Sequence, residues 1–192
     1  MKSKCKWAVL LISLFMCGCY VASPARTTQM TVTTVAATKE TDISPLRDNI
    51  KVNDVSGGKK TRPIFSYSKI GNDEFRGALE ISLNSAGLLE RTKGEGRYSL
   101  DAHLLSVDQP IFGGFSMTVT TNVMYVLEDK ESGNELFREV ITAEYTAKTS
   151  DHVIGAVRLQ IANEGAARKN ISKLINKLVQ LSISQGIVIT PH

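Results

Sequence analysis

Cysteine is missing from all but the start of this 192-residue chain. Its three cysteines, Cys5, Cys17 and Cys19, lie within the first nineteen residues. This distribution excludes a disulfide framework or a cysteine-based metal site in the remainder of the chain. It also suits an oxidising compartment, where an unpaired thiol in a folded domain is a liability.

Residue patterns that support catalysis or metal binding are also absent. The three histidines, His103, His152 and His192, show no spacing typical of metal ligands. The sequence has no Gly-x-Ser-x-Gly nucleophile motif, no phosphate-binding loop and no Gly-x-Gly-x-x-Gly motif after a predicted strand. We therefore predict a protein that is not an enzyme and that binds no metal and no cofactor.

The apolar run near the N-terminus is too short to span a membrane. Residues 7–16 form a run of ten residues, whereas a membrane-spanning helix needs about 20. The run follows Lys2, Lys4 and Lys6 and ends at the sequence Met-Cys-Gly-Cys, residues 16–19. A basic segment, a short apolar segment and a small residue before the cleavage point are typical of a secretory signal peptide. We predict this signal peptide at residues 1–18.

The end of this segment resembles the lipobox of bacterial lipoprotein precursors. There the cysteine after the small residue becomes the first residue of the mature chain and carries the lipid, which implies acylation of Cys19. An aspartate directly after the lipidated cysteine would resemble an inner-membrane retention signal. Here Tyr20 stands at that position, so we predict that the protein lies on the periplasmic side of the outer membrane. The alternative is a soluble secreted protein that is cleaved nearer Ala22 or Ala25.

Signal removal also changes the charge. The precursor has a formal charge of +4, and loss of its three N-terminal lysines leaves 20 basic and 19 acidic residues, a net charge of +1. A nearly neutral mature chain gives no electrostatic reason to expect nucleic acid as a partner.

The mature chain divides into three parts. Residues 19–48 are rich in Thr, Ser and Ala, with one short apolar patch at residues 30–32. Because this composition cannot bury a core, we predict a lipidated cysteine followed by a flexible tether with a span of roughly 30 Å. Residues 49–182 are sufficient for a single domain, and residues 183–192 form a predicted C-terminal tail.

Hydrophobic periodicity predicts the elements of this domain. Alternating apolar residues predict strands at residues 50–55, 98–104, 115–127 and 137–147. Helical spacing predicts one helix from Asn72, as its N-cap, to Gly87, and a long helix after Asp151 with an apolar stripe that ends at Leu181. The order β-α-β-β-β-α predicts an α+β two-layer sandwich: a mainly antiparallel sheet with two helices on one face.

Two stretches are candidates for binding. In the long helix, Asn163, Glu164 and Arg168 could form a docking face for a partner; Glu164 and Arg168 are also spaced for an i,i+4 ion pair. The alternative is that the small residues at 165–167 pack closely against the sheet. The second stretch is an apolar loop with Ile111, Phe112 and Phe115, which could bind lipid or a partner, or could fold under the sheet as a bulge.

The same stretches carry a resemblance to known proteins. Residues 73–80, 108–110, 117–120 and 162–171 resemble a group of small proteobacterial outer-membrane lipoproteins of unassigned function. Some members are labelled UDP-N-acetylglucosamine acyltransferase, but that enzyme resembles a β-helix of hexapeptide repeats, and this chain has no such period. A weaker architectural likeness is to the lipoprotein that helps to assemble lipopolysaccharide.

These observations lead to two functional hypotheses. The first is an outer-membrane lipoprotein, attached through its N-terminal lipid, that acts as a non-enzymatic accessory protein and binds an envelope protein. The second is a lipid- or glycan-binding envelope module.

Overall fold

The computed structural model describes residues 23–33, 45–61, 68–110 and 114–186. The predicted signal peptide, Cys19 and the last six residues lie outside these ranges. Four strands form one sheet in the order β1 (Ile50–Ser56), β2 (Tyr98–Asp108), β3 (Ser116–Asp129) and β4 (Glu135–Lys148).

The sheet is mainly antiparallel, as predicted. Strands β2, β3 and β4 are consecutive antiparallel neighbours, and Val123 of β3 faces Leu104 of β2 and Ile141 of β4. Strand β1 instead pairs parallel with β2, because the helix α3 (Asn72–Ser85) returns the chain between them. This arrangement confirms the predicted α+β class.

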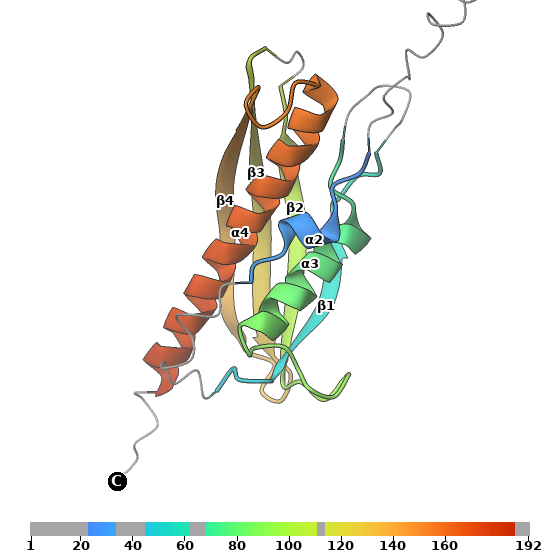
Figure 1. Ribbon diagram of the computed structural model, residues 1–192. Helices are drawn as coiled ribbons and strands as arrows, with labels where there is room; N and C mark the ends of the chain where they lie inside the picture. The colour runs from blue at the N-terminus through green and yellow to red at the C-terminus, as the bar shows by residue number, and fades with distance from the viewer. Residues whose placement is uncertain (1–22, 34–44, 62–67, 111–113, 187–192) are drawn as a thin grey trace, which may run out of the picture.

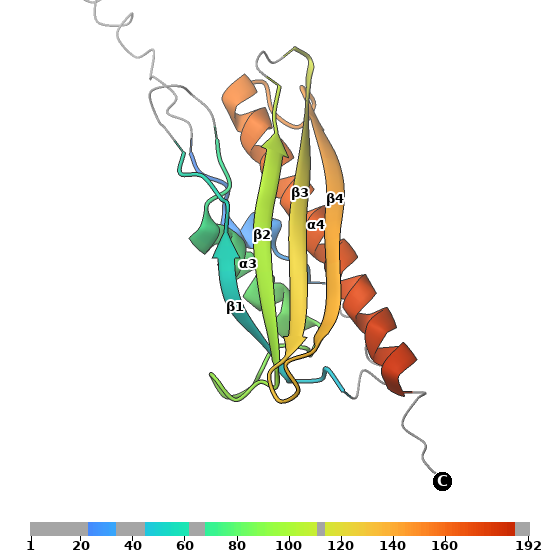
Figure 2. The ribbon, with the colours of Figure 1, turned by 180° about the vertical axis from the view of Figure 1, so that it is seen from behind.

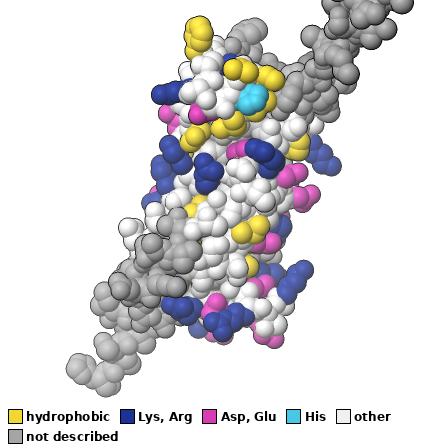
Figure 3. Space-filling model, viewed as in Figure 1, with side chains coloured by type: hydrophobic (Ala, Val, Ile, Leu, Met, Phe, Trp, Pro, Cys, Tyr) yellow, Lys and Arg dark blue, Asp and Glu magenta, His cyan; other side chains and the backbone are white. Residues whose placement is uncertain are grey.

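The helices cover one face of the sheet. Helices α3 and α4 (Gly155–Gly186) lie on the same side (Figure 1), and no helix of the described residues crosses the opposite side (Figure 2). Along β3, Val119 and Val123 are fully buried under the helices, whereas Thr118 is exposed on the open side. The two-layer sandwich is therefore confirmed. On the face seen in Figure 3, basic and acidic side chains are interspersed.

The core has a large and a small part. The large part joins α3, α4 and all four strands, and the small part lies under the first half of α4. The small part consists of Met117, Val119, Ala147, Leu159, Ala162 and Ala166. Because α4 contributes two alanines there, its backbone can approach the sheet closely. Within the described ranges, no helix is both long enough and apolar enough to cross a membrane.

One polar network lies inside the core. The fully buried Asn170 of α4 donates from Nδ2 to the carbonyl oxygen of Ile141 at 2.7 Å and accepts at Oδ1 from the hydroxyl of Tyr125 at 2.9 Å. Burial raises the pKa of the Tyr125 hydroxyl, so this group keeps its proton and donates. The network fixes the height of α4 over β3 and β4.

The predicted flexible tether is wrong for residues 23–33, which we call the N-terminal arm. The arm contains the short helix α2 (Thr27–Met30), which lies between α3 and α4 (Figure 1). Ala25, Met30 and Val32 are buried in the main core, and so is Leu46. The folded unit therefore begins before residue 49.

Two predicted helix boundaries also need correction. The N-cap of α3 is Gly71, because the Oδ1 atom of Asn72 accepts the backbone N–H of Gly58 at 2.7 Å and does not cap its own helix. At the other end of the chain, α4 continues to Gly186, four residues into the predicted tail. The remainder of that tail lies outside the described residues.

Candidate functional site

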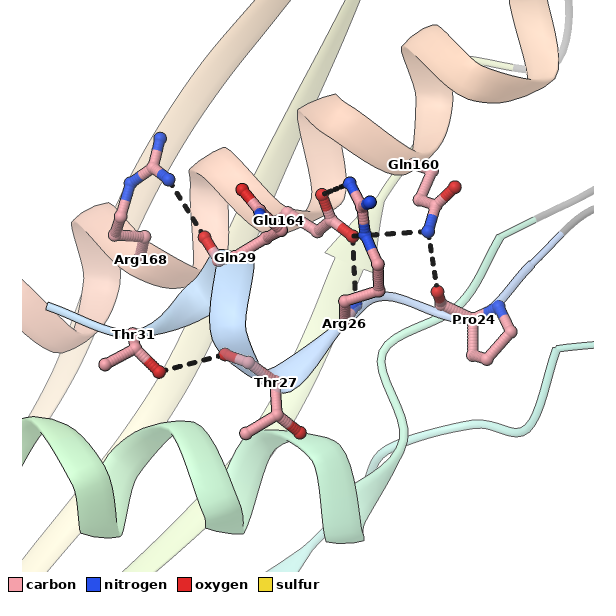
Figure 4. Close-up of polar contacts among 8 residues, drawn as sticks. All are labelled: Pro24, Arg26, Thr27, Gln29, Thr31, Gln160, Glu164 and Arg168. Carbon is pink, nitrogen blue, oxygen red and sulfur yellow. Dashed lines mark hydrogen bonds and ion pairs between the residues drawn. The ribbon is translucent and has the colours of Figure 1, made fainter.

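The docking face predicted in the long helix lies on α4, where the N-terminal arm covers it. The carboxylate of Glu164, whose residue is 3% exposed, accepts three hydrogen bonds from Arg26. The Nε and Nη2 atoms of Arg26 lie 2.9 and 3.0 Å from the two carboxylate oxygens, and the backbone N–H lies 2.9 Å from Oε1 (Figure 4). The i,i+4 spacing predicts an ion pair between Glu164 and Arg168. In the structure Glu164 pairs with Arg26 instead.

Further contacts continue this pairing along the helix. Gln160 donates from Nε2 to the carbonyl oxygen of Pro24 at 2.9 Å, and Arg168 donates from Nη1 to that of Gln29 at 2.9 Å (Figure 4). Residue numbers therefore rise along the arm and along α4 in the same direction. The arm therefore runs parallel to α4, with its first residues beside the first turns of the helix.

Asn163 points to a different part of the chain. Its side chain is fully buried, donates from Nδ2 to the carbonyl oxygen of Ser68 at 3.0 Å and accepts at Oδ1 from Gln109 at 2.6 Å. Gln109 also accepts from the ammonium group of Lys69 at 2.8 Å. Asn163 thus joins α4 to the end of β2 and to the segment that leads into α3.

These contacts correct the predicted docking face. Asn163 and Glu164 are inaccessible to a second protein, and Arg168 is half-buried and bonded to the arm. The alternative of close packing holds at Gly165, because a Cβ atom there would overlap the ring of Tyr145 on β4. Lys169, 5.4 Å from the centre of that ring, covers it from the solvent side.

The predicted apolar loop is described only at its end. Ile111 and Phe112 lie outside the described residues, so their part of the prediction stays open. Phe115 is 88% exposed, which excludes a position under the sheet for this residue. Val153 and Ile154, from the connection between β4 and α4, are 82% and 42% exposed.

The described histidines have structural contacts. His103 and Ser56 share a hydrogen bond of 2.8 Å on the open face of the sheet, and His152 accepts the backbone N–H of Ile154 at 3.1 Å. No cluster of His, Cys, Asp or Glu side chains in the described ranges could hold a metal ion. A surface hollow of about 600 Å³ beside α3 carries both signs of charge, from Lys51, Arg76, Glu80, Glu90, Arg91 and Lys93.

A carboxyl group with a lowered pKa lies at the β3–β4 hairpin. Asp129 accepts hydrogen bonds from Nε and Nη2 of Arg97 at 3.0 and 2.6 Å. This pairing holds the pKa of the Asp129 carboxyl well below its usual range. The pair joins the start of β2 to the hairpin, so we assign it a structural role.

Comparison with known proteins supports the fold. No protein-family profile and no curated protein sequence matches the chain. A solved structure from Xanthomonas campestris, of a domain family of unknown function, aligns with a TM-score of 0.52 at 12% identity and covers 74% of this chain and 92% of its own. This similarity confirms the α+β architecture and carries no information on function.

Two further solved structures are described as lipoproteins. A candidate lipoprotein from Caulobacter crescentus has a TM-score of 0.48 and 15% identity, and covers 76% of this chain and 95% of its own. A minor lipoprotein from Acinetobacter baumannii has a TM-score of 0.42 and 13% identity, and covers 72% and 92%. At these scores neither adds to the argument on the fold.

Sequence reasoning missed Arg26, the residue that binds Glu164. Arg26 lies in a polar segment that resembles a tether in composition. One local signal was present, the apolar patch at residues 30–32, and two of its residues, Met30 and Val32, are buried. No local pattern, however, indicates that the patch packs beside a helix 130 residues later.

Proposed function

We propose that this chain is a bacterial envelope lipoprotein, attached to the periplasmic side of the outer membrane through acylated Cys19. In this proposal its domain is a non-enzymatic accessory module that binds an envelope protein. The support from sequence is the predicted signal peptide, with its cleavage point between Gly18 and Cys19, and the nearly neutral mature chain.

The observation that carries the proposal is the contact between the N-terminal arm and α4. A free tether would let the domain rotate at a distance from the membrane. Here Arg26, seven residues after Cys19, makes a bidentate pair with the buried Glu164. Charge-assisted bidentate bonds of this kind are directional. An anchor at Cys19 would therefore hold the domain in a defined orientation, which is useful to a protein that presents a surface to a partner.

The open side of the sheet is the surface best placed for that partner. It is free of helices in the described residues (Figure 2), and Thr118, Thr142 and Thr146 line it. Strand β4 also forms one edge of the sheet. Exposed edges offer backbone hydrogen-bonding groups to an added strand, which is a common mode of peptide recognition.

The anchoring part of the proposal is tested at Cys19. Mass spectrometry of the mature protein should find an acylated N-terminal Cys19, and the Cys19→Ala variant should accumulate as uncleaved precursor. An unmodified mature chain that begins near Ser23 or Arg26 would disprove lipid anchoring. Stable attachment needs more than one acyl chain, so two or three should be found.

The partner-binding part is tested by photo-crosslinking in cells. A photoreactive residue at Thr142, on the open side, should give one discrete protein adduct. The same residue at Ile81, which is 44% exposed on α3, is the matched control and should give none. Equal labelling at both positions, or none at either, would contradict a partner on the open side.

A second candidate function is a lipid-binding module, which the 88% exposure of Phe115 favours. Such a module would retain lipid after purification, and extraction of the purified protein followed by mass spectrometry would detect it. Stoichiometric lipid without a protein adduct would favour this second function over the first.

A further inference from the structure

Three large apolar side chains are exposed together at one end of the molecule. Phe115, Val153 and Ile154, which we call the apolar tip, come from the β2–β3 and β4–α4 connections. These connections are neighbours, because the backbone N–H of Thr149 donates to the carbonyl oxygen of Phe115 at 2.9 Å. Figure 3 shows hydrophobic side chains gathered at this end, beside a histidine.

A buried arginine fixes the shape of the tip. Arg158, 5% exposed, donates to the carbonyl oxygens of Gly114 at 2.8 Å, His152 at 2.9 Å and Val153 at 2.8 Å. Removal of a guanidinium group from water is costly. The bonds of this group to three carbonyl oxygens hold the β2–β3 and β4–α4 connections in place. The exposure of the tip is thus part of a defined structure.

The tip lies at the end of the domain where the chain arrives from Cys19. Because Pro24 contacts Gln160 and Gln29 contacts Arg168, the arm enters beside the first turns of α4, the helix that begins directly after Ile154. Only four residue steps separate Cys19 from Ser23, and they can span at most about 14 Å. Acyl chains on Cys19 would therefore place a bilayer close to the tip.

The tip has little net charge. Its exposed ionic residues are Lys148 and Asp151, one of each sign. Attraction to anionic headgroups therefore contributes little, whereas burial of the three apolar side chains away from water is favourable. The chemistry of the tip fits the boundary between the headgroups and the acyl chains of a bilayer. Apolar faces of interfacial helices are buried about 5–10 Å into this boundary.

We propose that Phe115, Val153 and Ile154 insert into the same membrane leaflet that holds the acyl chains of Cys19. The domain then stands on the membrane with the first turn of α4 toward the bilayer and the β3–β4 hairpin away from it. This inference rests on the proposed lipid anchor and adds a second, protein-mediated contact with the membrane.

Tryptophan fluorescence tests the inference directly. The sole tryptophan, Trp7, lies in the signal peptide, so the acylated chain from Cys19 has none. Phe115→Trp places one probe at the tip, and Val140→Trp, 46% exposed in the middle of β4, is the matched control. Val140 lies eight residues before Lys148, which corresponds to about 26 Å along the strand.

Each acylated variant is reconstituted into phosphatidylcholine vesicles with brominated acyl chains. Phe115→Trp should show a blue shift and lose most of its emission, because bromine quenches only tryptophan that reaches the acyl chains. Val140→Trp should keep its emission. High salt should change neither result, since the tip has little net charge.

The other outcomes overturn the inference in distinguishable ways. Absence of quenching at both positions shows that the tip stays in water, and quenching at both shows that the domain lies flat. A blue shift of Phe115→Trp without bromine quenching shows that the tip is buried by protein. Mass spectrometry of the same samples checks acylation: an unacylated Cys19 would refute the lipid anchor and the tip proposal together, whereas failed quenching of an acylated protein would refute the tip alone.

Discussion

Glu164 joins the two ends of the described chain. Its carboxylate accepts bonds from the side chain and backbone of Arg26 and, at 3.2 Å, from Gln160. The Arg26 side chain is 56% exposed, so solvent screens part of the attraction, whereas the Glu164 side chain is 4% exposed. The contact therefore contributes to stability mainly through the hydrogen bonds that satisfy the buried carboxylate of Glu164.

We predict that Glu164→Ala releases the N-terminal arm. The substitution removes the carboxylate that accepts from the backbone and side chain of Arg26 and from Gln160, which keeps its bond to Pro24. We expect a cost of about 1–3 kcal/mol. Hydrogen exchange of residues 23–33 should become faster, while exchange in β3 stays slow. Glu144→Ala, at an exposed residue of β4, is the control and should change neither. Unchanged exchange in the arm of Glu164→Ala would contradict the assigned role.

A second residue-scale prediction concerns acid. The Arg97 pairing lowers the folded-state pKa of Asp129, while the unfolded-state value is about 3.9. The pair therefore stabilises the fold above the unfolded-state pKa, and this contribution is lost as the pH falls toward the folded-state pKa. Asp129→Asn should be less stable than the wild type at pH 7, and the difference should narrow below about pH 4.

Urea denaturation of both proteins across this pH range provides the measurement. Glu131→Gln is the control, because Glu131 pairs with the same arginine but its side chain is 69% exposed. That substitution should have little effect at any pH. A constant difference between Asp129→Asn and the wild type would show that the pKa shift does not stabilise the fold.

At the scale of elements, α4 packs closely against β4. Gly165 faces the ring of Tyr145, while Ala162 and Ala166 are fully buried on neighbouring turns. Side chains this small bring the helix backbone near the sheet, and the buried Asn170 then finds its partners on β3 and β4. The small side chains and the Asn170 hydrogen bonds thus favour the same short distance between α4 and the sheet.

We predict that Gly165→Leu overpacks this contact and lowers stability by about 1–3 kcal/mol, because even the added Cβ atom would overlap Cγ of Tyr145, the atom that joins the ring to its side chain. Gly114→Leu, at a glycine with open space around it, should be tolerated. Thermal melts of the two variants provide the comparison. Adding Tyr145→Ala to Gly165→Leu should recover part of the loss, and additive effects would contradict direct contact.

At the scale of the whole molecule, the arm belongs to the folded unit. It fills the space between α3 and α4, and Met30 is fully buried there. One end of the molecule then combines the chain entry and the apolar tip, and the other holds the β3–β4 hairpin. This polarity underlies the orientation that we propose at a membrane.

We predict that Met30→Ala lowers the free energy of unfolding by about 2–5 kcal/mol, as at other buried methionines. Thr28→Ala, at an exposed position of the same short helix, should change it little. Denaturant titration of both variants gives the measurement. If the arm were a flexible tether, Met30→Ala and Thr28→Ala would have the same free energy of unfolding, which would contradict this prediction.

The sequence by itself determined the order and type of the main elements. Alternation along β3 and the apolar stripe of α4 are local patterns, because each follows from the geometry of its own strand or helix. The layer arrangement follows from the same patterns, since both helices must bury a stripe against one face of the sheet.

Only the tertiary structure decided what covers Asn163, Glu164 and Arg168. The partner of Glu164 lies 138 residues away, and that of Asn163 lies 95 residues away. Contacts at such separation depend on how whole elements stack, and no repeating pattern encodes them. The physical reason is that one charged residue on a helix looks the same in sequence whether solvent, a partner or its own chain satisfies it. Folding decides among the three, and here the N-terminal arm supplies the groups that satisfy Glu164.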